Sequence, residues 1–351
     1  MSIATAFEVK GWCPGVLTPM PSGDGLLVRI KPWCGAFTVA QAAGIADIAE
    51  RLGNGHIDLT RRANLQIRGL REQTLGELRG ALGRLHLLDT DAATEAARNV
   101  MVGPLGDDDV RSLANALTRE IVADRRLAAL PAKFGWLVDA GGPLSIVGER
   151  ADVALFVLPR GVALRLRGEW LGIASREQAV KTAIGLALGD QPLLSAMGDL
   201  PTTGARHLGQ ISGFFGVAAP FGGLEAEQLR ALAATPGASE LRLSPWRALY
   251  LDAPPADVAG LIVDATDPLL RIEACPGAPA CRSSSVDTRR DARRLAASGF
   301  KGTIHISGCA KGCARSAAAD LTLVGESGRY GVVHNGTTRD PFEKTIEPNA
   351  L

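Results

Sequence analysis

Residues 26–70, LLVRIKPWCGAFTVAQAAGIADIAERLGNGHIDLTRRANLQIRGL, decide the fold. The stretch begins with an apolar segment and passes a turn that contains Pro32 and Gly35. Apolar residues then recur at helical spacing as far as a glycine loop, and the last part alternates between apolar and polar residues. The stretch therefore predicts a strand, a helix of about three turns and a second strand, in that order.

Residues 214–254, FFGVAAPFGGLEAEQLRALAATPGASELRLSPWRALYLDAP, repeat the same order of features. The two copies differ by four residues, which the pattern places in the loop between helix and strand. Chance similarity of two β-α-β units remains the alternative explanation. The pairing aligns Pro32 with Pro220, Gly35 with Gly223, Leu59-Thr60 with Leu243-Ser244, and Gln66 with Tyr250.

A segment of a second kind follows each copy, so the chain has the organisation A-B-A′-B′. The first such segment includes a helix near Asp108–Leu127, and the second contains four cysteines. Duplication predicts a pseudo-twofold arrangement with a site at the junction, because neither half encloses a ligand alone. The predicted domains are a half-domain at 1–92, an α/β domain at 93–203, a second half-domain at 204–268 and a second α/β domain at 269–351.

The composition describes a large globular protein without an overall electrostatic bias. The 351 residues are 46% hydrophobic and carry a net charge of +1, which excludes a global field favouring nucleic acid or anionic lipid. No apolar run reaches the ~18 residues of a membrane span, and the first fifteen residues lack a signal-peptide core. We therefore expect a cytoplasmic protein with no nucleic-acid or membrane partner. Six cysteines in a reducing compartment favour metal or redox chemistry over disulfides.

Four of the cysteines form two closely spaced pairs. Cys275 and Cys281 lie in EACPGAPACRSS, and Cys309 and Cys313 lie in HISGCAKGCARS. The glycines and prolines of both segments predict loops, which leave backbone N–H groups to bond cluster sulfur. The spacing favours a [4Fe–4S] cluster. Zinc is the structural alternative, although its sites prefer shorter spacing at both ends, and buried unligated thiols are the second alternative.

Cys13 and Cys34 lie in the first half-domain, in GWCPG and PWCGAF. The simpler interpretation is that they are ordinary buried or turn cysteines. Their spacing does not support a role as ligands of another iron.

Together, the cysteine spacing, the A-B-A′-B′ duplication and the strand LTRRANLQIRG resemble the sulfite/nitrite reductase superfamily over nearly the whole chain. The resemblance implies an α+β, internally duplicated fold with two ferredoxin-like half-domains and two α/β domains that bind the cluster and a tetrapyrrole. Within the superfamily, the phrases CPGVLTPMPSGDGLLVRIKP, GNGHIDLTRRANLQIRGL and SGCAKGCARS resemble the precorrin-3B synthase family.

That family resemblance implies an O2-dependent monooxygenase of cobalamin biosynthesis. The substrate would be precorrin-3A, hydroxylated at C20 with closure of the ring-A acetate to a γ-lactone. The implied cofactors are a [4Fe–4S] cluster and a mononuclear non-haem iron. Siroheme is implied only under the alternative of a sulfite or nitrite reductase, in which Cys313 would also ligate the siroheme iron. A non-enzymatic Fe–S or tetrapyrrole-binding protein is the second alternative.

The carboxylate arms of such a substrate require cations, because buried unpaired carboxylates are costly. All but seven of the 38 basic residues are Arg, whose planar forks suit carboxylates. A GC-rich genome is the simpler explanation of this bias. Alternation on the strands places basic and amide side chains on shared faces, with a solvated sheet face as the alternative. The predicted substrate-binding residues are Arg29, Lys31, Arg62, Asn64, Gln66 and Arg68.

The resemblance also implies an active-site role for Lys133 in LPAKFG, and a catalytic role beside it for Arg62. The reductases carry a second basic or amide residue two positions after that lysine, where this sequence has Gly135. The difference argues against sulfite or nitrite reduction, because one cation of the anion cage is missing. Asn99 in ARNVMVGP also lies in a family-like motif, although a turn or cap role is the simpler interpretation.

The ligands of a mononuclear iron cannot be named from the sequence. No His-x-Asp or His-x-Glu pair stands out, and His207 and His305 are weak candidates beside ordinary structural roles. No glycine-rich dinucleotide motif follows a strand. The expected partners are therefore the tetrapyrrole substrate, O2 and an external electron donor or reductase.

Overall fold

The computed structural model describes residues 12–199 and 201–351. The described chain forms two compact units. The main unit contains Trp12–Met20 and Leu27–Val263, and the C-terminal unit contains Pro21–Leu26 and Asp264–Leu351. The four domain ranges expected from the sequence remain a prediction, and residues 1–11 of the first range lie outside the described residues.

Two five-stranded sheets of the described chain share one strand order. The first runs β1-β2-β5-β4-β13 and the second runs β11-β12-β15-β14-β3. Each predicted β-α-β copy, together with the short strand just before it, thus supplies one hairpin, one short strand and a second hairpin. The single strand expected after the helix is a hairpin in both copies. The strands are β1 Met20–Ser22, β2 Gly25–Ile30, β3 Ala36–Thr38, β4 His56–Leu59, β5 Leu65–Leu70, β11 Gly209–Ile211, β12 Phe214–Ala218, β13 Gly223–Glu225, β14 Glu240–Leu243 and β15 Ala248–Leu251.

The two copies exchange their short third strands. Strand β3 pairs antiparallel with β14, and Phe37 lies opposite Leu241. Strand β13 pairs antiparallel with β4, and Leu224 lies opposite Ile57. Because the exchange is reciprocal, each sheet contains residues of both copies, as a pseudo-twofold pair requires.

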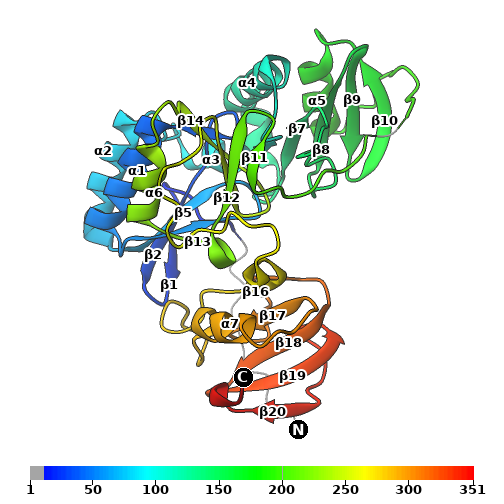
Figure 1. Cartoon of the computed structure of the whole chain (residues 1–351). Helices are drawn as coiled ribbons and strands as arrows, with labels where there is room; N and C mark the ends of the chain where they lie inside the picture. The colour runs from blue at the N-terminus through cyan, green and yellow to red at the C-terminus, as the bar shows by residue number, and fades with distance from the viewer. Residues whose placement is uncertain (1–11, 200) are drawn as a thin grey trace. The chain divides into compact units, whose positions relative to one another are not determined.

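Helices α1 (Val39–Leu52) and α6 (Ala226–Ala233) occupy equivalent places and lie side by side (Figure 1). Helix α1 begins with a capping box, in which Thr38 accepts from the Gln41 backbone and Gln41 accepts from the Thr38 backbone. The predicted place of the length difference was wrong. Helix α1 has 14 residues and α6 has 8, while the loop that follows is longer in the second copy. The helix therefore contains the difference.

The alignment of the turns before these helices also needs a correction of one residue. Left-handed backbone occurs at Cys34 and Gly35 in the first copy and at Phe221 and Gly222 in the second. Gly35 thus corresponds to Gly222, and Pro32 corresponds to Ala219. The prediction matched the visible prolines, whereas the turn is defined by its backbone angles.

Two further five-stranded sheets among the described residues form the α/β parts. Their orders are β10-β9-β8-β7-β6 and β16-β17-β18-β19-β20. In both, the first three strands along the chain are parallel and the last two are antiparallel, so the second duplication is also visible. The strands are β6 Val100–Val102, β7 Trp136–Asp139, β8 Val153–Leu158, β9 Gly161–Leu166, β10 Glu169–Ala174, β16 Ile272–Ala274, β17 Ile304–Ser307, β18 Ala319–Glu326, β19 Arg329–Gly336 and β20 Lys344–Ile346.

Helices α4 (Asp108–Ala123) and α5 (Ala179–Leu188) pack on the first α/β sheet. Asp107 caps α4 by accepting from the Val110 backbone at 3.1 Å. The buried residues of α4 recur at helical spacing and join a core around Trp136. The predicted helix at 108–127 is therefore present and ends four residues earlier. The remaining helices are α2 Leu75–Arg84, α3 Ala92–Ala97 and α7 Thr288–Ala296, with 3₁₀ turns at Glu72–Thr74, Arg125–Ala129, Pro220–Gly222, Pro268–Arg271 and Pro348–Ala350.

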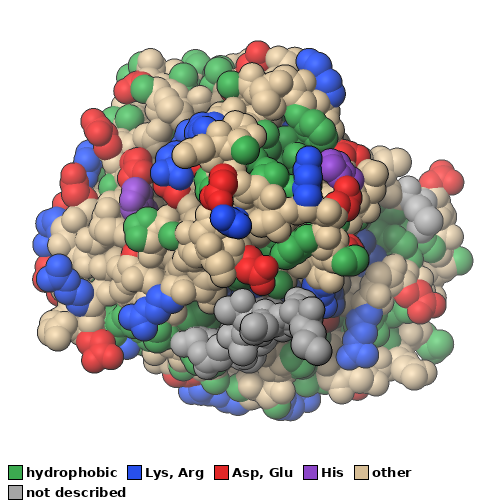
Figure 2. Space-filling model, turned by 90° about the horizontal axis from the view of Figure 1, so that it is seen from below, with side chains coloured by type: hydrophobic (Ala, Val, Ile, Leu, Met, Phe, Trp, Pro, Cys, Tyr) green, Lys and Arg blue, Asp and Glu red, His purple; other side chains and the backbone are tan. Residues whose placement is uncertain are grey.

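Acidic and basic side chains are interspersed over the face drawn in Figure 2, which agrees with the net charge of +1. In the described part of the chain, no helix has both the length and the apolar character needed to cross a membrane.

Candidate functional site

In the C-terminal unit, two parallel strands bring the cysteine loops together. Strands β16 and β17 are neighbours, with Ala274 paired to Ile306. Cys275 follows β16 directly, and the loop with Cys309 and Cys313 follows β17. Since parallel strands end at the same edge of a sheet, the topology places both cysteine pairs at one edge.

Glycines allow the loops to approach closely. Gly277 has φ +68°, and a Cβ there would lie 2.6 Å from the backbone nitrogen of Thr288. The Cys281 backbone donates to the carbonyl of Gly277 at 2.7 Å, which closes a turn between the first two thiols. Gly312, between the last two thiols, has φ +63°. Both positions therefore favour glycine.

The first sulfur accepts a backbone hydrogen bond. The Gly308 backbone N–H donates to Sγ of Cys275 at 3.2 Å. Backbone donors to cysteine sulfur stabilise thiolates and are typical of cluster-binding loops. Sequence reasoning missed a second support, because Gly23 and Ser22 donate to the carbonyl of Ala280 at 3.1 and 3.0 Å. The SGDG turn near the N-terminus was the available signal for it.

The four thiols influence one another electrostatically. Burial raises the pKa of Cys309, and the Cys281 and Cys275 thiols raise it further while the Lys311 backbone lowers it. Burial of its sulfur, together with the charges of the other three thiols, raises the pKa of Cys313 to about 11, although the residue as a whole is exposed. Four thiolates gathered in this way repel one another unless a cationic centre binds them.

These surroundings fit a cluster of iron and sulfide. Among the described residues, no group of three or more His, Cys, Asp or Glu side chains is placed to hold a single metal ion. A cubane differs from a single ion, because each thiolate binds its own iron at a separate corner. The fit of a cubane is therefore judged by the backbone hydrogen bond to Cys275 and by the mutual effects of the thiols on their pKa values. Both agree with four thiolates around one cluster.

In the main unit, a polar group surrounds Arg29 on β2. Its guanidinium donates to Oε1 of Gln66 on β5 at 2.9 Å. Burial lowers the pKa of Arg29, the Cys13 thiol raises it through charge and a hydrogen bond, and the charge of Arg62 lowers it again. Arg29, Gln66, Cys13 and Arg62 thus act on one another, and we call them the arginine group.

Arg62 lies in the tight turn between β4 and β5, not on the strand where the sequence pattern placed it. Ala63 has φ +51°, and β5 begins only at Leu65. A Cβ at Gly135 would lie 2.6 Å from an Nη atom of Arg62. The guanidinium therefore occupies the space in which a side chain at position 135 would begin.

Asn64 adds an unsatisfied donor to this end of the sheet. The residue is 3% exposed. Within the described chain, its Nδ2 has no hydrogen-bond partner. Buried polar groups nearly always have partners, so an orphaned amide nitrogen beside the Arg62 turn indicates an acceptor that the chain itself does not supply.

Lys133 is exposed in the loop before β7, two residues from the glycine that adjoins Arg62. Asn99 holds this loop, since its Nδ2 donates to the carbonyl of Phe134 at 3.1 Å and its own carbonyl accepts from the Trp136 backbone at 2.8 Å. Asn99 is thus a positioning residue for the Lys133 loop, a role the sequence did not specify.

Lys31 and Arg68 lie apart from the arginine group in buried networks. Lys31 is 5% exposed and donates from Nζ to the carbonyl of Glu95. Burial and the charge of Arg98 lower the pKa of Lys31 to about 7, against the opposing charge of Glu95. Arg68 is 4% exposed and forms an ion pair with Asp58 at 3.3 Å. Both contacts are those of structural residues, and substrate binding by either remains a prediction.

The remaining candidates are scattered. Cys34 is buried, its Sγ lies 3.4 Å from the carbonyl of Arg111, and burial raises the pKa of its thiol. His207 is exposed before β11, and His305 is fully buried on β17. For a mononuclear iron, the described residues therefore offer no ligand group.

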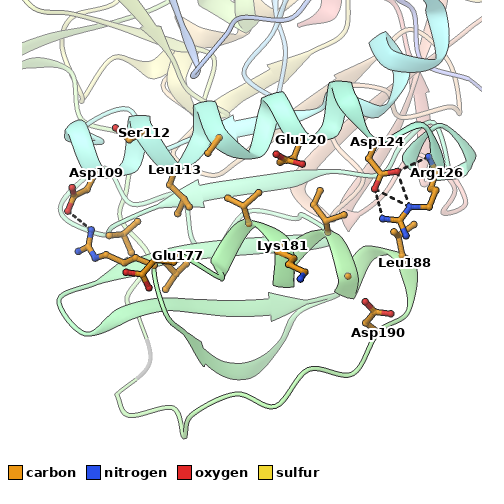
Figure 3. Close-up of a pocket in the computed structure, with 17 residues that line it drawn as sticks. Asp109, Ser112, Leu113, Glu120, Asp124, Arg126, Glu177, Lys181, Leu188 and Asp190 are labelled. Atoms are coloured by element: carbon orange, nitrogen blue, oxygen red, sulfur yellow. Dashed lines mark hydrogen bonds and ion pairs between the residues drawn. The ribbon is translucent and has the colours of Figure 1, made fainter.

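A groove of the main unit lies elsewhere, between α4 and α5 (Figure 3). Its volume is about 840 Å³, and its lining includes Leu113, Lys181 and Asp190. At its ends, Asp109 pairs with Arg176 and Asp124 with Arg126. It contains none of the predicted site residues, so its size does not make it the active site.

Comparison with known proteins agrees with this anatomy. Residues 18–85 match the nitrite/sulfite reductase ferredoxin-like half-domain family. A precorrin-3B synthase from Sinorhizobium sp. is 30% identical over 93% of this chain and 83% of its own length. The chain belongs to the precorrin-3B synthase family. The sulfite/nitrite reductase superfamily, indicated by the sequence, is thereby confirmed as well.

Other relatives of this synthase-family chain match over shorter stretches or at lower identity. A ferredoxin–nitrite reductase from Leptolyngbya laminosa is 25% identical over 41% of this chain and 30% of its own length. The solved structure of the Mycobacterium tuberculosis NirA protein has a TM-score of 0.70, covers 93% of this chain and 78% of its own, and is 18% identical. The last comparison shows the sulfite/nitrite reductase-like fold.

Proposed function

We propose that this protein hydroxylates precorrin-3A at C20 and closes the ring-A acetate to a γ-lactone. One oxygen atom of O2 enters the product, and the other leaves as water. The balance requires two electrons and two protons for each turnover, which an external donor supplies. Membership of the precorrin-3B synthase family supports the substrate class.

The proposed cofactor is a [4Fe–4S] cluster bound by Cys275, Cys281, Cys309 and Cys313. When bound, such a cluster transfers single electrons. The chain's own contribution is to gather four thiolates at the edge of β16 and β17 and to donate a backbone hydrogen bond to the first of them. A mononuclear iron is part of the family expectation, but no described residue group fits it, so no step is assigned to it.

The arginine group and Asn64 are proposed to hold carboxylate arms of the substrate. Arg29 and Arg62 supply guanidinium forks, and Gln66 orients the first by accepting its hydrogen bond at 2.9 Å. Asn64 supplies the orphaned Nδ2 donor. Two like charges held near each other are stabilised by an anion between them, which is the charge that a polycarboxylate provides. Lys133 is proposed as a further cation, since its loop adjoins Arg62 through Gly135.

The contact between Arg62 and Gly135 carries the choice of a synthase over a reductase. A second basic side chain after Lys133 would cage a small oxyanion, and here that position is a glycine. Position 135 therefore supplies no cation, and the Arg62 guanidinium lies where its side chain would begin, which excludes a larger residue there without a shift of Arg62. The nitrite reductases match only part of this chain, and their similarity does not change the residue at position 135.

The test begins with anaerobic purification and measurement of iron, acid-labile sulfide and the absorption spectrum. We expect four or more irons and four sulfides per chain, and a plain Fe–S spectrum without siroheme bands. The protein is then mixed with precorrin-3A, a reductant and ¹⁸O2, and the product is analysed by mass spectrometry. One labelled oxygen in a lactone product supports the proposal. Siroheme bands with sulfite- or nitrite-dependent electron consumption would replace it with the reductase alternative, and a cluster without either activity would favour the binding protein.

A further inference from the structure

Helix α7 presents a basic face directly after the first cysteine loop. Its buried residues lie at positions 288, 291, 292 and 295, which is one face at helical spacing. The other face consists of arginines, at positions 289, 290, 293 and 294. Arg290 and Arg294 are 60% and 41% exposed. Arg293 is exposed as well, whereas Arg289 is half-buried, so the exposed face of the helix is basic.

Arginines four residues apart on a helix repel each other, so this pattern destabilises the helix by itself. The only carboxylate within the helix, Asp291, is fully buried, lies within ion-pair distance of Arg290 and Arg294, and accepts from the Tyr330 hydroxyl at 2.8 Å. It neutralises part of the charge from beneath. Arg282 and Lys301 extend the exposed basic surface before and after the helix.

The same helix contacts the proposed cluster site. Thr288, its first residue, donates from Oγ1 to the carbonyl of Cys275, and Oγ1 lies 3.9 Å from Sγ of that cysteine. Arg282 follows Cys281 directly in the sequence. A partner that covers α7 and Arg282 would thus lie against the loop that holds two of the four thiols.

We propose that Arg282, Lys301 and the arginine face of α7 form the docking surface for an acidic, one-electron carrier protein. The inference rests on the proposed function, which needs an external electron donor. Charge complementarity selects the partner, because a surface of one sign accelerates encounter with the opposite sign. At each encounter the reduced carrier loses one electron and the cluster gains it, so two encounters serve one turnover.

The experiment uses the full chain with its cluster reconstituted, and a reduced plant-type [2Fe–2S] ferredoxin as the acidic carrier. The variant Arg282→Glu/Arg293→Glu reverses two charges of the surface and leaves Arg290 and Arg294 in place over Asp291. Stopped-flow absorption at low ionic strength is expected to show cluster reduction slowed roughly tenfold or more. Added salt should slow the wild-type reaction steeply and the variant reaction little.

Two controls separate docking from damage. Reduced methyl viologen, a small cation, should reduce both proteins fully, which shows that the variant is folded and loaded. The matched variant Arg71→Glu/Arg84→Glu reverses two exposed charges of the main unit and should behave as wild type. Equal ferredoxin rates and equal salt dependence in all three proteins would overturn the docking surface.

The docking surface and the proposed function fail in different ways. If the wild-type chain bound no cluster, the proposed function would fall. The affinity of oxidised ferredoxin, measured by calorimetry at low ionic strength, would still test the surface. A roughly tenfold weaker affinity of the charge-reversed variant supports it, and equal affinity overturns it.

Discussion

The two half-domain copies share one strand order, but the first carries polar side chains where the second carries a glycine and an aromatic ring. On the first copy, Arg29 donates across the sheet to Gln66. The equivalent residues on the second copy are Gly216 and Tyr250, which are paired neighbours on β12 and β15. A Cβ at Gly216 would lie 2.8 Å from the Tyr250 ring, so the ring covers the place where the first copy carries a guanidinium.

In the two α/β copies it is the second that carries the candidate cluster cysteines, and the first that does not. After β17 of the second copy, the chain enters a cysteine loop. After β7 of the first, the buried Asp139 gathers the loop instead, accepting from the Ser145 hydroxyl and the Ile146 backbone at 2.8 Å each. Burial raises the pKa of Asp139, and these hydrogen bonds oppose the shift.

The difference teaches that strand order was kept in both copies while the side chains at equivalent places diverged. The proposed polar binding residues occupy the first half-domain, and the proposed cluster thiols occupy the second α/β part. Asp139 accepts hydrogen bonds from its own loop, and the Tyr250 ring covers its own sheet, so side chains of the protein itself fill these two positions. The proposed sites lie where side chains of the duplicated fold, such as that of Asn64, lack partners from the part of the chain that the structure describes.

The largest effect is expected from the thiols. Cys313→Ser removes one of four ligands, so we expect loss of the cluster and of all activity. Iron and acid-labile sulfide per chain, with the anaerobic spectrum, measure it. Cys34→Ser is the matched control from the first copy, because Cys34 has no place in the cluster and should leave the spectrum unchanged. Full cluster content in Cys313→Ser would contradict the ligand assignment.

The arginine group should give the next largest effect. Arg62→Ala removes one charge-assisted contact to a carboxylate, which is worth about 1.5–3 kcal/mol, or roughly ten- to hundredfold in affinity. The cluster spectrum should not change. Fluorescence titration with the polycarboxylate uroporphyrin measures the affinity. Arg61→Ala, an exposed neighbour outside the group, is the control. Equal affinities of the two variants would remove Arg62 from the binding site.

Much of this comparison was predictable from the sequence, and the reasons for the rest are physical. Cysteine spacing and the repeated pattern are local features, so the duplicated fold and the superfamily were predicted and confirmed. The exchange of β3 and β13 was not predicted, because a three-residue strand carries no information about which sheet it joins.

The candidate site shows the same limit. Alternation placed Arg29 and Lys31 on one face, but it does not report depth along the strand. The structure leaves Arg29 near Arg62 and buries Lys31 against Glu95. Arg68 has its partner Asp58 ten residues earlier, on the neighbouring strand, which only the register reveals.

A smaller effect is expected from Gly135→Ala. The new Cβ would lie 2.6 Å from the Arg62 guanidinium, whose flexible side chain moves away. We expect uroporphyrin affinity to fall several-fold, less than in Arg62→Ala, with little change in stability. In the double variant Gly135→Ala/Arg62→Ala, the two losses should not add, because both act through one guanidinium. Gly76→Ala, where a Cβ meets nothing within 4 Å, is the control. Additive losses would show that Gly135 acts by another route.

The smallest effect concerns stability, at a position where the copies differ in charge. Lys31 corresponds to Ala218 of the second copy, which does not titrate. Burial lowers the pKa of Lys31 from 10.5 to about 7, so between these pH values the unfolded chain holds a proton that the folded chain has released. The free energy of unfolding should therefore rise with pH across this window, by up to about 1.4 kcal/mol per pH unit from this group, and not change further below it.

Lys31→Met should lose that part of the slope. Urea unfolding of the cluster-free protein at pH 7, 8 and 9 measures the difference, in which the titration of thiols common to both proteins cancels. Parallel slopes would mean that Lys31 keeps an ordinary pKa and points to solvent, and it would then return to the candidate substrate-binding residues.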